Sequence, residues 1–272
     1  MCLVTFAYQQ LDELPLILAA NRDEWRDRPT AHAHIWVDDS SIYGGQDLTS
    51  GGSWLAVSTH APYRLACVTN VRNPESIAEH HSHTWLSRGL VISDFIRSEH
   101  SCEDFLTRLA LDRYGACNLI LYDGDALWYA SNRAQDGQHQ NIQRQLTPGV
   151  YGLSNAQLDT SWPKTIATRG ALADQLLTIK TETVDKSINV LRDSLWDALS
   201  NPQIYPEEQL PSTGVPTEME SSLSAALIVG EGYGTRSQAL VFMARSGVQF
   251  EERILDHHGE VMQSSRVGFG AL

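Results

Sequence analysis

The sequence predicts an α+β fold with mainly antiparallel sheets, in one domain of residues 1–272. Segments with strand character cluster near both ends of the chain, and segments with helical periodicity lie in the middle. Short polar turns join neighbouring strand segments, which is typical of antiparallel hairpins. The 272 residues include 42% hydrophobic and 19% charged side chains, a composition that can bury a sizeable core.

Charge and cysteine content narrow the class of protein. The chain carries 20 Lys and Arg against 33 Asp and Glu, a formal net charge of −13. We therefore expect no binding to nucleic acid, which requires basic patches. No apolar run reaches the ~18 residues of a membrane span, and no secretory signal is visible. The four cysteines lack paired spacing, so we expect reduced thiols and a cytoplasmic location.

The first eight residues, Met1–Tyr8, are the segment around which the predicted site is built. Val4 and Thr5 beside two aromatic residues favour a partly buried strand. If Met1 is removed, Cys2 carries a nucleophilic sulfur and a free α-amine with an ordinary pKa of about 7.7–8.0, which can act as a base. The alternative interpretation is a buried structural cysteine, because free cysteines are often buried.

A second strand, Pro15–Ala20, is expected to pair with the first as an antiparallel hairpin. It ends in the charged run Asn21-Arg22-Asp23-Glu24-Trp25. Most charge clusters are solvated turns, but hairpin pairing would bring these charges close to Cys2, which raises the odds of a functional site.

The remaining elements follow from periodicity and turn residues. Ser101 is the expected N-cap of a helix, with Asp104 at the third helical position. Residues 30–52 are predicted to form loop and short extended pieces, with glycine pairs at the turns. The proline-rich stretch 201–217 is predicted to be an excursion or lid. Further strands are predicted at 53–58, 64–69, 118–122, 126–130, 149–155, 224–229, 237–244 and 248–255, and helices at 90–97, 101–109, 164–178 and 186–199.

Three histidines, His80, His81 and His83, lie within one polar loop. A metal or haem site would use such residues, but no carboxylate or thiol stands at a recognisable ligand spacing. A solvated loop is the favoured interpretation, and we expect no bound metal.

Four polar clusters follow predicted strands: Asn21–Glu24, Asn70–Arg72, Asn155 and Tyr233–Arg236. An N-terminal nucleophile needs a carboxylate to orient its amine and neutral donors to hold the oxyanion that develops during attack. Asparagine amides supply such donors, and a nearby guanidinium favours the thiolate. Together with Cys2, these clusters contain each group that the chemistry requires.

Several motifs occur in order along the whole chain: Met1-Cys2-Leu3, Asn21-Arg22-Asp23-Glu24, Thr69-Asn70-Val71-Arg72, Ser87-Arg88-Gly89, Gly152-Leu153-Ser154-Asn155 with Leu158-Asp159, Trp162-Pro163-Lys164 and Tyr233-Gly234-Thr235-Arg236. They resemble the NRDE family, whose eukaryotic members are called transport and Golgi organisation protein 2. The resemblance implies a four-layer αββα sandwich of two mainly antiparallel sheets, of the N-terminal-nucleophile hydrolase type. It also implies kinship with cysteine amidohydrolases such as penicillin V acylase and bile salt hydrolase.

Carried over position by position, the resemblance makes Cys2 the nucleophile and Asn70 and Asn155 the donors that bracket the oxyanion. Those hydrolases end their second strand in Arg-x-x-Asp-aromatic. A gapless match pairs their Arg and Asp with Asn21 and Glu24, and a one-residue slip favours Arg22 and Asp23, which we prefer on chemical grounds. The other expected site residues are Arg236, as a further catalytic guanidinium, and Asn21, Glu24, Trp25 and Arg72, for substrate binding.

Two classes of function follow, and both expect a small-molecule ligand. In the first, the chain hydrolyses a small non-peptide amide or related acyl compound, with the Cys2 thiolate as nucleophile and its α-amine as base. In the second, the chain is a binding or carrier protein that retains the fold, because the resemblance also implies roles in secretion and Golgi organisation, lipid or acyl-CoA homeostasis, and haem trafficking.

Haem would then be cargo, and no cofactor is expected; the chain has no Cys-x-x-Cys-His motif. A purely structural role for Cys2, Asn70 and Asn155 ranks last. A structural role would not explain why the charged residues Arg22, Asp23 and Arg236 occur near Cys2.

Overall fold

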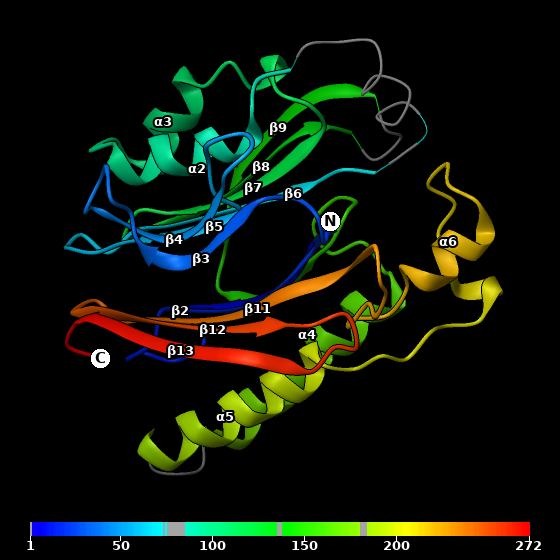
Figure 1. The fold of residues 1–272 in the computed structure, drawn as a ribbon. Coiled ribbons are helices and arrows are strands. Elements are labelled where there is room, and N and C mark those ends of the chain that lie inside the picture. The colour runs from blue at the N-terminus through cyan, green and yellow to red at the C-terminus, as the bar shows by residue number, and fades with distance from the viewer. Residues whose placement is uncertain (1, 73, 75–84, 135–137, 180–183) are drawn as a thin grey trace.

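Two antiparallel β-sheets lie face to face, with helices on their outer faces (Figure 1). The computed structural model describes residues 2–72, 74, 85–134, 138–179 and 184–272. The first sheet has six strands, in the spatial order β10 (Gly149–Leu153), β1 (Cys2–Tyr8), β2 (Leu16–Trp25), β11 (Tyr233–Met243), β12 (Gly247–Leu255) and β13 (Val261–Gly270). The second has seven, in the order β3 (Thr30–Ile35), β4 (Ile42–Asp47), β5 (Leu55–Ser58), β6 (Leu65–Asn70), β7 (Cys117–Tyr122), β8 (Leu127–Arg133) and β9 (His139–Gln145).

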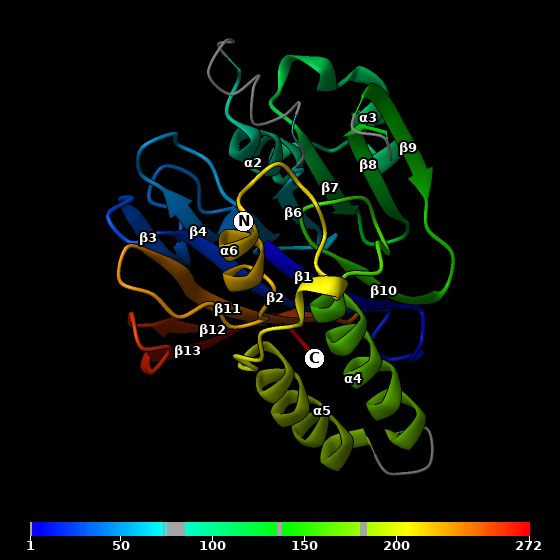
Figure 2. The same cartoon turned by 90° about the vertical axis from the view of Figure 1, so that its right-hand side faces the viewer.

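Helices form the two outer layers. α2 (Arg88–Arg97) and α3 (Cys102–Arg108) cover the second sheet, whereas α4 (Pro163–Ile179) and α5 (Val184–Leu199) lie side by side on the first (Figures 1 and 2). The layer order is therefore αββα, and the predicted α+β fold of two antiparallel sheets is confirmed. The shorter elements are η1 (Leu111–Arg113), η2 (Glu207–Gln209) and α6 (Thr217–Ser222), and α6 lies on the side of the molecule where β1 begins.

Strands β1 and β2 are buried on both faces because they lie between the opposite sheet and the helices. Successive side chains of a strand point to opposite faces. Cys2, Val4 and Phe6 therefore pack in the core between the two sheets, and Ala7 and Ile17 pack against α4 and α5. This sandwiching places the first residue of β1 inside the molecule rather than on its surface.

The prediction of loop and short extended pieces over 30–52 is confirmed in part, because β3 and β4 are the extended pieces. The prediction that Gly44 and Gly45 form a turn is wrong. Gly44 and Gly45 are not turn residues but lie within β4. A Cβ on Gly44 would lie 2.6 Å from the Leu55 carbonyl oxygen, and one on Gly45 would lie 2.1 Å from the Trp54 ring. Close packing, not turn formation, thus requires glycine here.

The predicted strand at 224–229 is also wrong, because these residues form turns and irregular backbone. β11 is already paired with β2 on one side and β12 on the other, so this segment cannot pair with the strand that follows it. Its backbone instead bonds polar side chains: Ala226 O accepts from Asn21 Nδ2 at 2.8 Å, and Ile228 N donates to Thr235 Oγ1 at 2.9 Å.

Other expectations are confirmed or lie outside the described residues. Ser101 Oγ accepts a hydrogen bond from Asp104 N, so Ser101 caps α3 as predicted. Strands β9 and β13 were not predicted. The loop with His80, His81 and His83 lies outside the described residues. No helix in the described part of the chain is long and apolar enough to cross a membrane.

Candidate functional site

Cys2 opens strand β1 in the middle of the first sheet. It pairs with Arg22 across the β1–β2 ladder, and its side chain faces the second sheet beside Val4. The residue is 9% exposed. Its carbonyl oxygen accepts a hydrogen bond from Ser154 Oγ at 3.0 Å. The predicted nucleophile is therefore fixed by β2 on one side and by the end of β10 on the other.

Strand β2 presents its charged residues to two different layers. Arg22 and Glu24 continue the face of Ala20 toward the second sheet, and Arg22 Nη2 lies 3.8 Å from Glu24 Oε2. Asn21 and Asp23 point the other way, toward the helices. Arg22 and Asp23, which we preferred as the catalytic pair, thus approach Cys2 from opposite faces of the same strand.

The side chains of Asn21 and Asp23 bond to groups in and near the helical layer. Asn21 Nδ2 donates to the carbonyl oxygens of Leu199 and Ala226, both at 2.8 Å. Asp23 Oδ1 accepts from Thr235 Oγ1 at 2.7 Å. Asn21, expected to bind substrate, therefore ties the end of α5 to the sheet.

The predicted oxyanion donors, Asn70 and Asn155, lie next to each other although they are 85 positions apart. Asn155 Nδ2 donates to Asn70 O at 2.9 Å, and Asn155 O accepts from Arg72 N at 2.7 Å. Ser154, which holds the Cys2 carbonyl, is the preceding residue. An amide nitrogen has two protons to donate, and the second one on Asn155 has no acceptor among the described residues.

Arg72 and Arg236 use their guanidinium groups to fix chain segments. Arg72 Nη2 pairs with Glu220 Oε2 of α6 at 2.8 Å, and both side chains are buried. Arg236 lies at the bulge in β11, and its Nη1 donates to Trp25 O at 3.0 Å and to Arg28 O at 2.6 Å. The Trp25 side chain is 57% exposed.

The surroundings of Cys2 favour the thiol over the thiolate. Burial raises the pKa of the Cys2 thiol, and the carboxylates of Asp23 and Glu24 raise this pKa further. Arg22 acts in the opposite direction. Because burial is the largest effect, Cys2 requires a proton acceptor before it can attack a carbonyl.

A buried pair of opposite charges lies on the helical side of Cys2. Burial raises the pKa of the Asp23 carboxyl, whereas Lys164 and the hydrogen bond from Thr235 lower it. Burial likewise lowers the pKa of the Lys164 amine, and Asp23 opposes that change. Lys164 Nζ donates to Leu223 O at 2.7 Å. Each charge therefore favours the ionised form of the other.

Tyr233 contributes a buried hydroxyl close to the same charges. Its oxygen has no hydrogen-bond partner among the described residues. Burial raises the pKa of this phenol, and the negative charge of Asp23 raises it further. The group is therefore a neutral donor in reach of the site.

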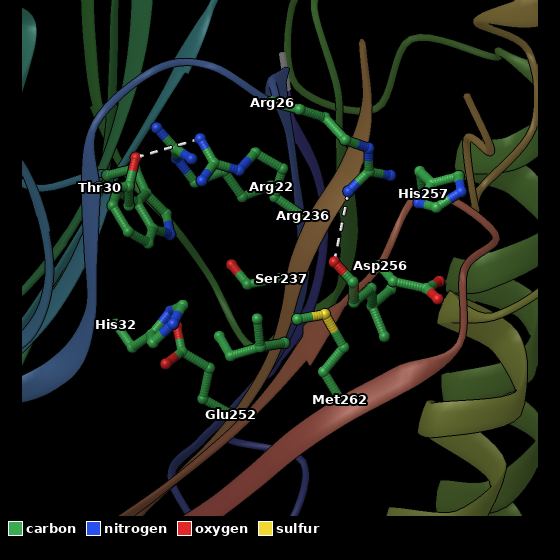
Figure 3. A pocket seen from close by; sticks show the side chains of 13 residues that line it. Arg22, Arg26, Thr30, His32, Arg236, Ser237, Glu252, Asp256, His257 and Met262 are labelled. Atoms are coloured by element: carbon green, nitrogen blue, oxygen red, sulfur yellow. Dashed lines mark hydrogen bonds between the residues drawn. The ribbon is translucent and has the colours of Figure 1, made fainter. Parts of the chain in front are cut away.

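A pocket of about 290 Å³ opens beside Arg22 (Figure 3). Strands β2, β3, β11, β12 and β13 line it. Arg22 and Arg236 gather at one end, near Thr30, whereas Glu252 lies beside His32. Met262, which is 67% exposed, lies at the rim.

A much smaller cavity, of about 10 Å³, lies against Cys2 and Cys67, enough for about one water molecule. Arg22, Trp54 and Ser237 border both this cavity and the larger pocket. The Arg22 guanidinium stacks on the Trp54 ring at 4.2 Å. The Arg22–Trp54 pair thus forms part of the wall between Cys2 and the pocket.

Residues 1–257 match the family model described as Transport and Golgi organisation 2. The chain belongs to the TANGO2 family. It is 32% identical to the Transport and Golgi organization protein 2 homolog of Homo sapiens, over 93% of this chain and 92% of that protein. It is 26% identical to Transport and Golgi organization protein 2 of Drosophila melanogaster, over 96% of this chain and 95% of that one.

Among solved structures, this TANGO2-family chain is similar to a Caenorhabditis elegans N-acylethanolamine-hydrolyzing acid amidase ortholog. The TM-score is 0.49 and the sequence identity 9%, over 90% of this chain and 93% of the other.

Four residues of this TANGO2-family chain lie in or beside the site but were not among the predicted site residues: Trp54, Lys164, Tyr233 and Glu252. Lys164 and Tyr233 stand within motifs that the family resemblance had already singled out. The alternation of side chains along a strand could have revealed Glu252. Phe250 faces the core between the sheets, so a residue two positions later lies on the same side of the strand. No group of three or more His, Cys, Asp or Glu side chains within the described ranges could hold a metal ion.

Proposed function

We propose that this chain is an N-terminal-cysteine hydrolase of a small non-peptide amide or a related acyl compound. The observation that carries the proposal is the convergence, at the start of β1, of Cys2, Arg22 and the Asn70–Asn155 pair. These groups come from four separate strands or strand ends. A purely structural cysteine would need neither a buried guanidinium nor an unused amide proton beside it.

The proposed reaction has two stages. The Cys2 sulfur attacks the substrate carbonyl carbon, a C–S bond forms, and the Asn155 amide donates to the developing oxyanion. The tetrahedral intermediate collapses, the C–N bond breaks, and the leaving amine takes the proton that the thiol gave up. Water then attacks the thioester and releases a carboxylic acid and free Cys2.

The proton requires an acceptor because burial raises the pKa of the Cys2 thiol. In this proposal the acceptor is the α-amine that Cys2 gains when Met1 is removed, whose ordinary pKa is about 7.7–8.0. Asp23 is the carboxylate that orients this amine, and Lys164 favours its ionised form. Removal of Met1 is thus a condition for activity.

The test starts from the purified full chain, whose intact mass reports whether Met1 is removed. We expect its loss, together with selective alkylation of Cys2 over Cys67, because burial raises the pKa of Cys67 well above the ordinary range. Replacing the nucleophile in Cys2→Ser should lower turnover of a small-amide panel by a factor on the order of 10⁴ or more.

Cys102→Ala serves as the matched control, because Cys102 lies in the core between the second sheet and α2 and α3, away from the site. It should retain turnover. Retention of Met1, or a Cys2 that reacts no faster than Cys67, would contradict the hydrolase mechanism.

A binding or carrier function is the second candidate. It is favoured by the stacked pair Arg22–Trp54, which stands between the pocket and Cys2, and by the protonated state that burial imposes on the thiol. Roles in secretion and Golgi organisation, and haem as cargo, belong to this candidate. A haem absorption spectrum that changes when single His or Cys residues are replaced would support haem binding.

A further inference from the structure

Arg22 is a buried guanidinium with unused hydrogen-bonding capacity. Its side chain is 6% exposed, its nearest carboxylate oxygen is 3.8 Å away on Glu24, and it donates no hydrogen bond to any described residue. Arginine carries five N–H donors, and burying them without acceptors is costly. These donors face the 290 Å³ pocket, so a ligand in the pocket could accept hydrogen bonds from them.

Arg236 adds a second positive charge at the same end of the pocket. Figure 3 shows its guanidinium beside that of Arg22, next to Thr30. Burial lowers the pKa of Arg236, and the charge of Arg22 lowers it further. Arg236 is held in place by the Trp25 and Arg28 carbonyls, so it cannot turn away from Arg22. An anion between the two guanidinium groups would relieve this repulsion.

The other lining residues determine what kind of ligand would fit the rest of the pocket. Arg26 lines the pocket, but its guanidinium nitrogens donate to the carbonyls of Gly230, Leu255 and Thr235. These bonds use three of its five N–H groups, so Arg26 adds positive charge but has fewer donors left for a ligand than Arg22 has. Ile254 and Met262 supply an apolar wall. The pocket thus combines the cationic Arg22–Arg236 end with an apolar side, and the carboxylates of Glu252 and Asp256 line it elsewhere. Its volume suits a small molecule.

We propose that this pocket binds a small molecule whose carboxylate or phosphate lies between Arg22 and Arg236 and whose short apolar body lies along Ile254 and Met262. When the anion binds, it replaces the Trp54 ring as the main partner of the Arg22 guanidinium. Both residues border the Cys2 cavity as well as the pocket. The identification of this ligand as substrate rests on the proposed hydrolase function, but its binding does not.

Calorimetric titration tests the proposal with four probes: hexanoate, hexyl phosphate, inorganic phosphate and the uncharged hexanol. The protein is the full chain carrying Cys2→Ser, so that binding is measured without turnover and a failure of hydrolysis leaves the result intact. At least one of hexanoate and hexyl phosphate should bind about tenfold or more tightly than hexanol, as a charge-assisted hydrogen bond implies. The tighter of the two identifies the anion.

Arg22→Met keeps an unbranched apolar stem against Trp54 and removes the charge, and it should weaken anion binding by about tenfold or more. Arg253→Met is the matched control, because Arg253 also stacks on a tryptophan at 4.2 Å, on Trp196, but lies outside the pocket. It should change affinity by less than about twofold.

Three results would overturn the proposal: hexanol binding as tightly as both anions, unchanged anion binding in Arg22→Met, or binding of inorganic phosphate alone. The comparison of hexanoate and hexyl phosphate with hexanol needs no substitution in the pocket. It therefore decides the matter even if Arg22→Met does not fold.

Discussion

Glu252 is a buried carboxylic acid in a pocket that also contains basic side chains. It is 4% exposed, and its Oε2 accepts from Ala33 N of β3 at 2.7 Å. The pocket around it also holds Arg22 of β2, His32 of β3 and Arg236 of β11. Burial raises the pKa of Glu252 from 4.5 to about 7, although Arg22 and the bond from Ala33 oppose the change.

This pKa makes stability depend on pH in a defined window. Between about pH 4.5 and 7 the folded chain holds a proton on Glu252 that the unfolded chain has lost, so stability falls as pH rises. Over the whole window the loss is on the order of 3 kcal/mol. Glu252→Gln removes this titration. The free energy of unfolding of the variant should therefore rise relative to that of the wild type between pH 4.5 and 7, and the difference should stay constant above pH 7.

Urea unfolding of both proteins across this range measures the difference. A difference in unfolding free energy that stays constant from about pH 4.5 to 7 would show that the folded-state pKa of Glu252 is not raised.

Single residues differ in how far the sequence reveals them. Cys2, Asn70 and Asn155 were predicted to converge because each lies at the start or end of a predicted strand, and the structure brings them together. The Arg22–Trp54 stack and the burial of Glu252 were not predicted. Both depend on how the second sheet lies over the first, which local patterns do not encode.

At the scale of elements, a buried ion pair helps to hold the segment from the end of α5 to α6. Glu220 of α6 pairs with Arg72 at 2.8 Å, and its other oxygen accepts from Thr213 N at 2.7 Å. Gly214 packs against Pro74, where a Cβ would lie 2.9 Å from the Pro74 Cα. This proline-rich segment is therefore held beside the chain that follows Asn70, rather than over the larger pocket.

Glu220→Ala should loosen this segment, because it leaves the buried Arg72 without its carboxylate, a loss of about 3–5 kcal/mol for a buried pair. Limited proteolysis with a glutamyl endopeptidase should then cleave faster after the exposed residues Glu207 or Glu208. Glu218→Ala is the control, since Glu218 lies on the same helix but is exposed. Equal cleavage rates in the two variants would contradict the role of the pair.

The sequence predicted elements well where periodicity or turn residues were strong. The helices α2 to α5 and the hairpins β1–β2 and β7–β8 are of this kind. It failed where packing between elements decided: Gly44 and Gly45 lie within a strand, and they must be glycine because Leu55 and Trp54 pack against them. The apolar residues at 224–229 form no strand beside β11, because β2 and β12 already occupy both of its edges.

At the scale of the whole molecule, a single core joins the two sheets. Phe6 and Val241 of the first sheet and Leu65 and Tyr129 of the second belong to the same cluster of buried side chains. Neither sheet can lose its inner face without exposing the inner face of the other. On this basis we continue to predict one domain for residues 1–272.

One domain implies one unfolding transition. Phe6→Ala in β1 and Leu65→Ala in β6 should lower the free energy of unfolding by about 3–5 and 2–5 kcal/mol respectively, because each leaves a cavity in the shared core. Circular dichroism and tryptophan fluorescence should report the same midpoint in each variant. Separate midpoints for the two probes, or a second transition in either variant, would mean that the sheets unfold independently.

Met262 at the pocket rim makes the proposed binding site sensitive to oxidants. Of the methionines in the described residues, Met243 is fully buried, whereas Met219 is 48% and Met262 is 67% exposed. Peroxide therefore reaches the Met262 thioether readily and converts it to a sulfoxide, a polar group in place of an apolar one. Oxidation of Met262 would thus change the ligand's apolar contact and leave the Arg22–Arg236 end chemically intact.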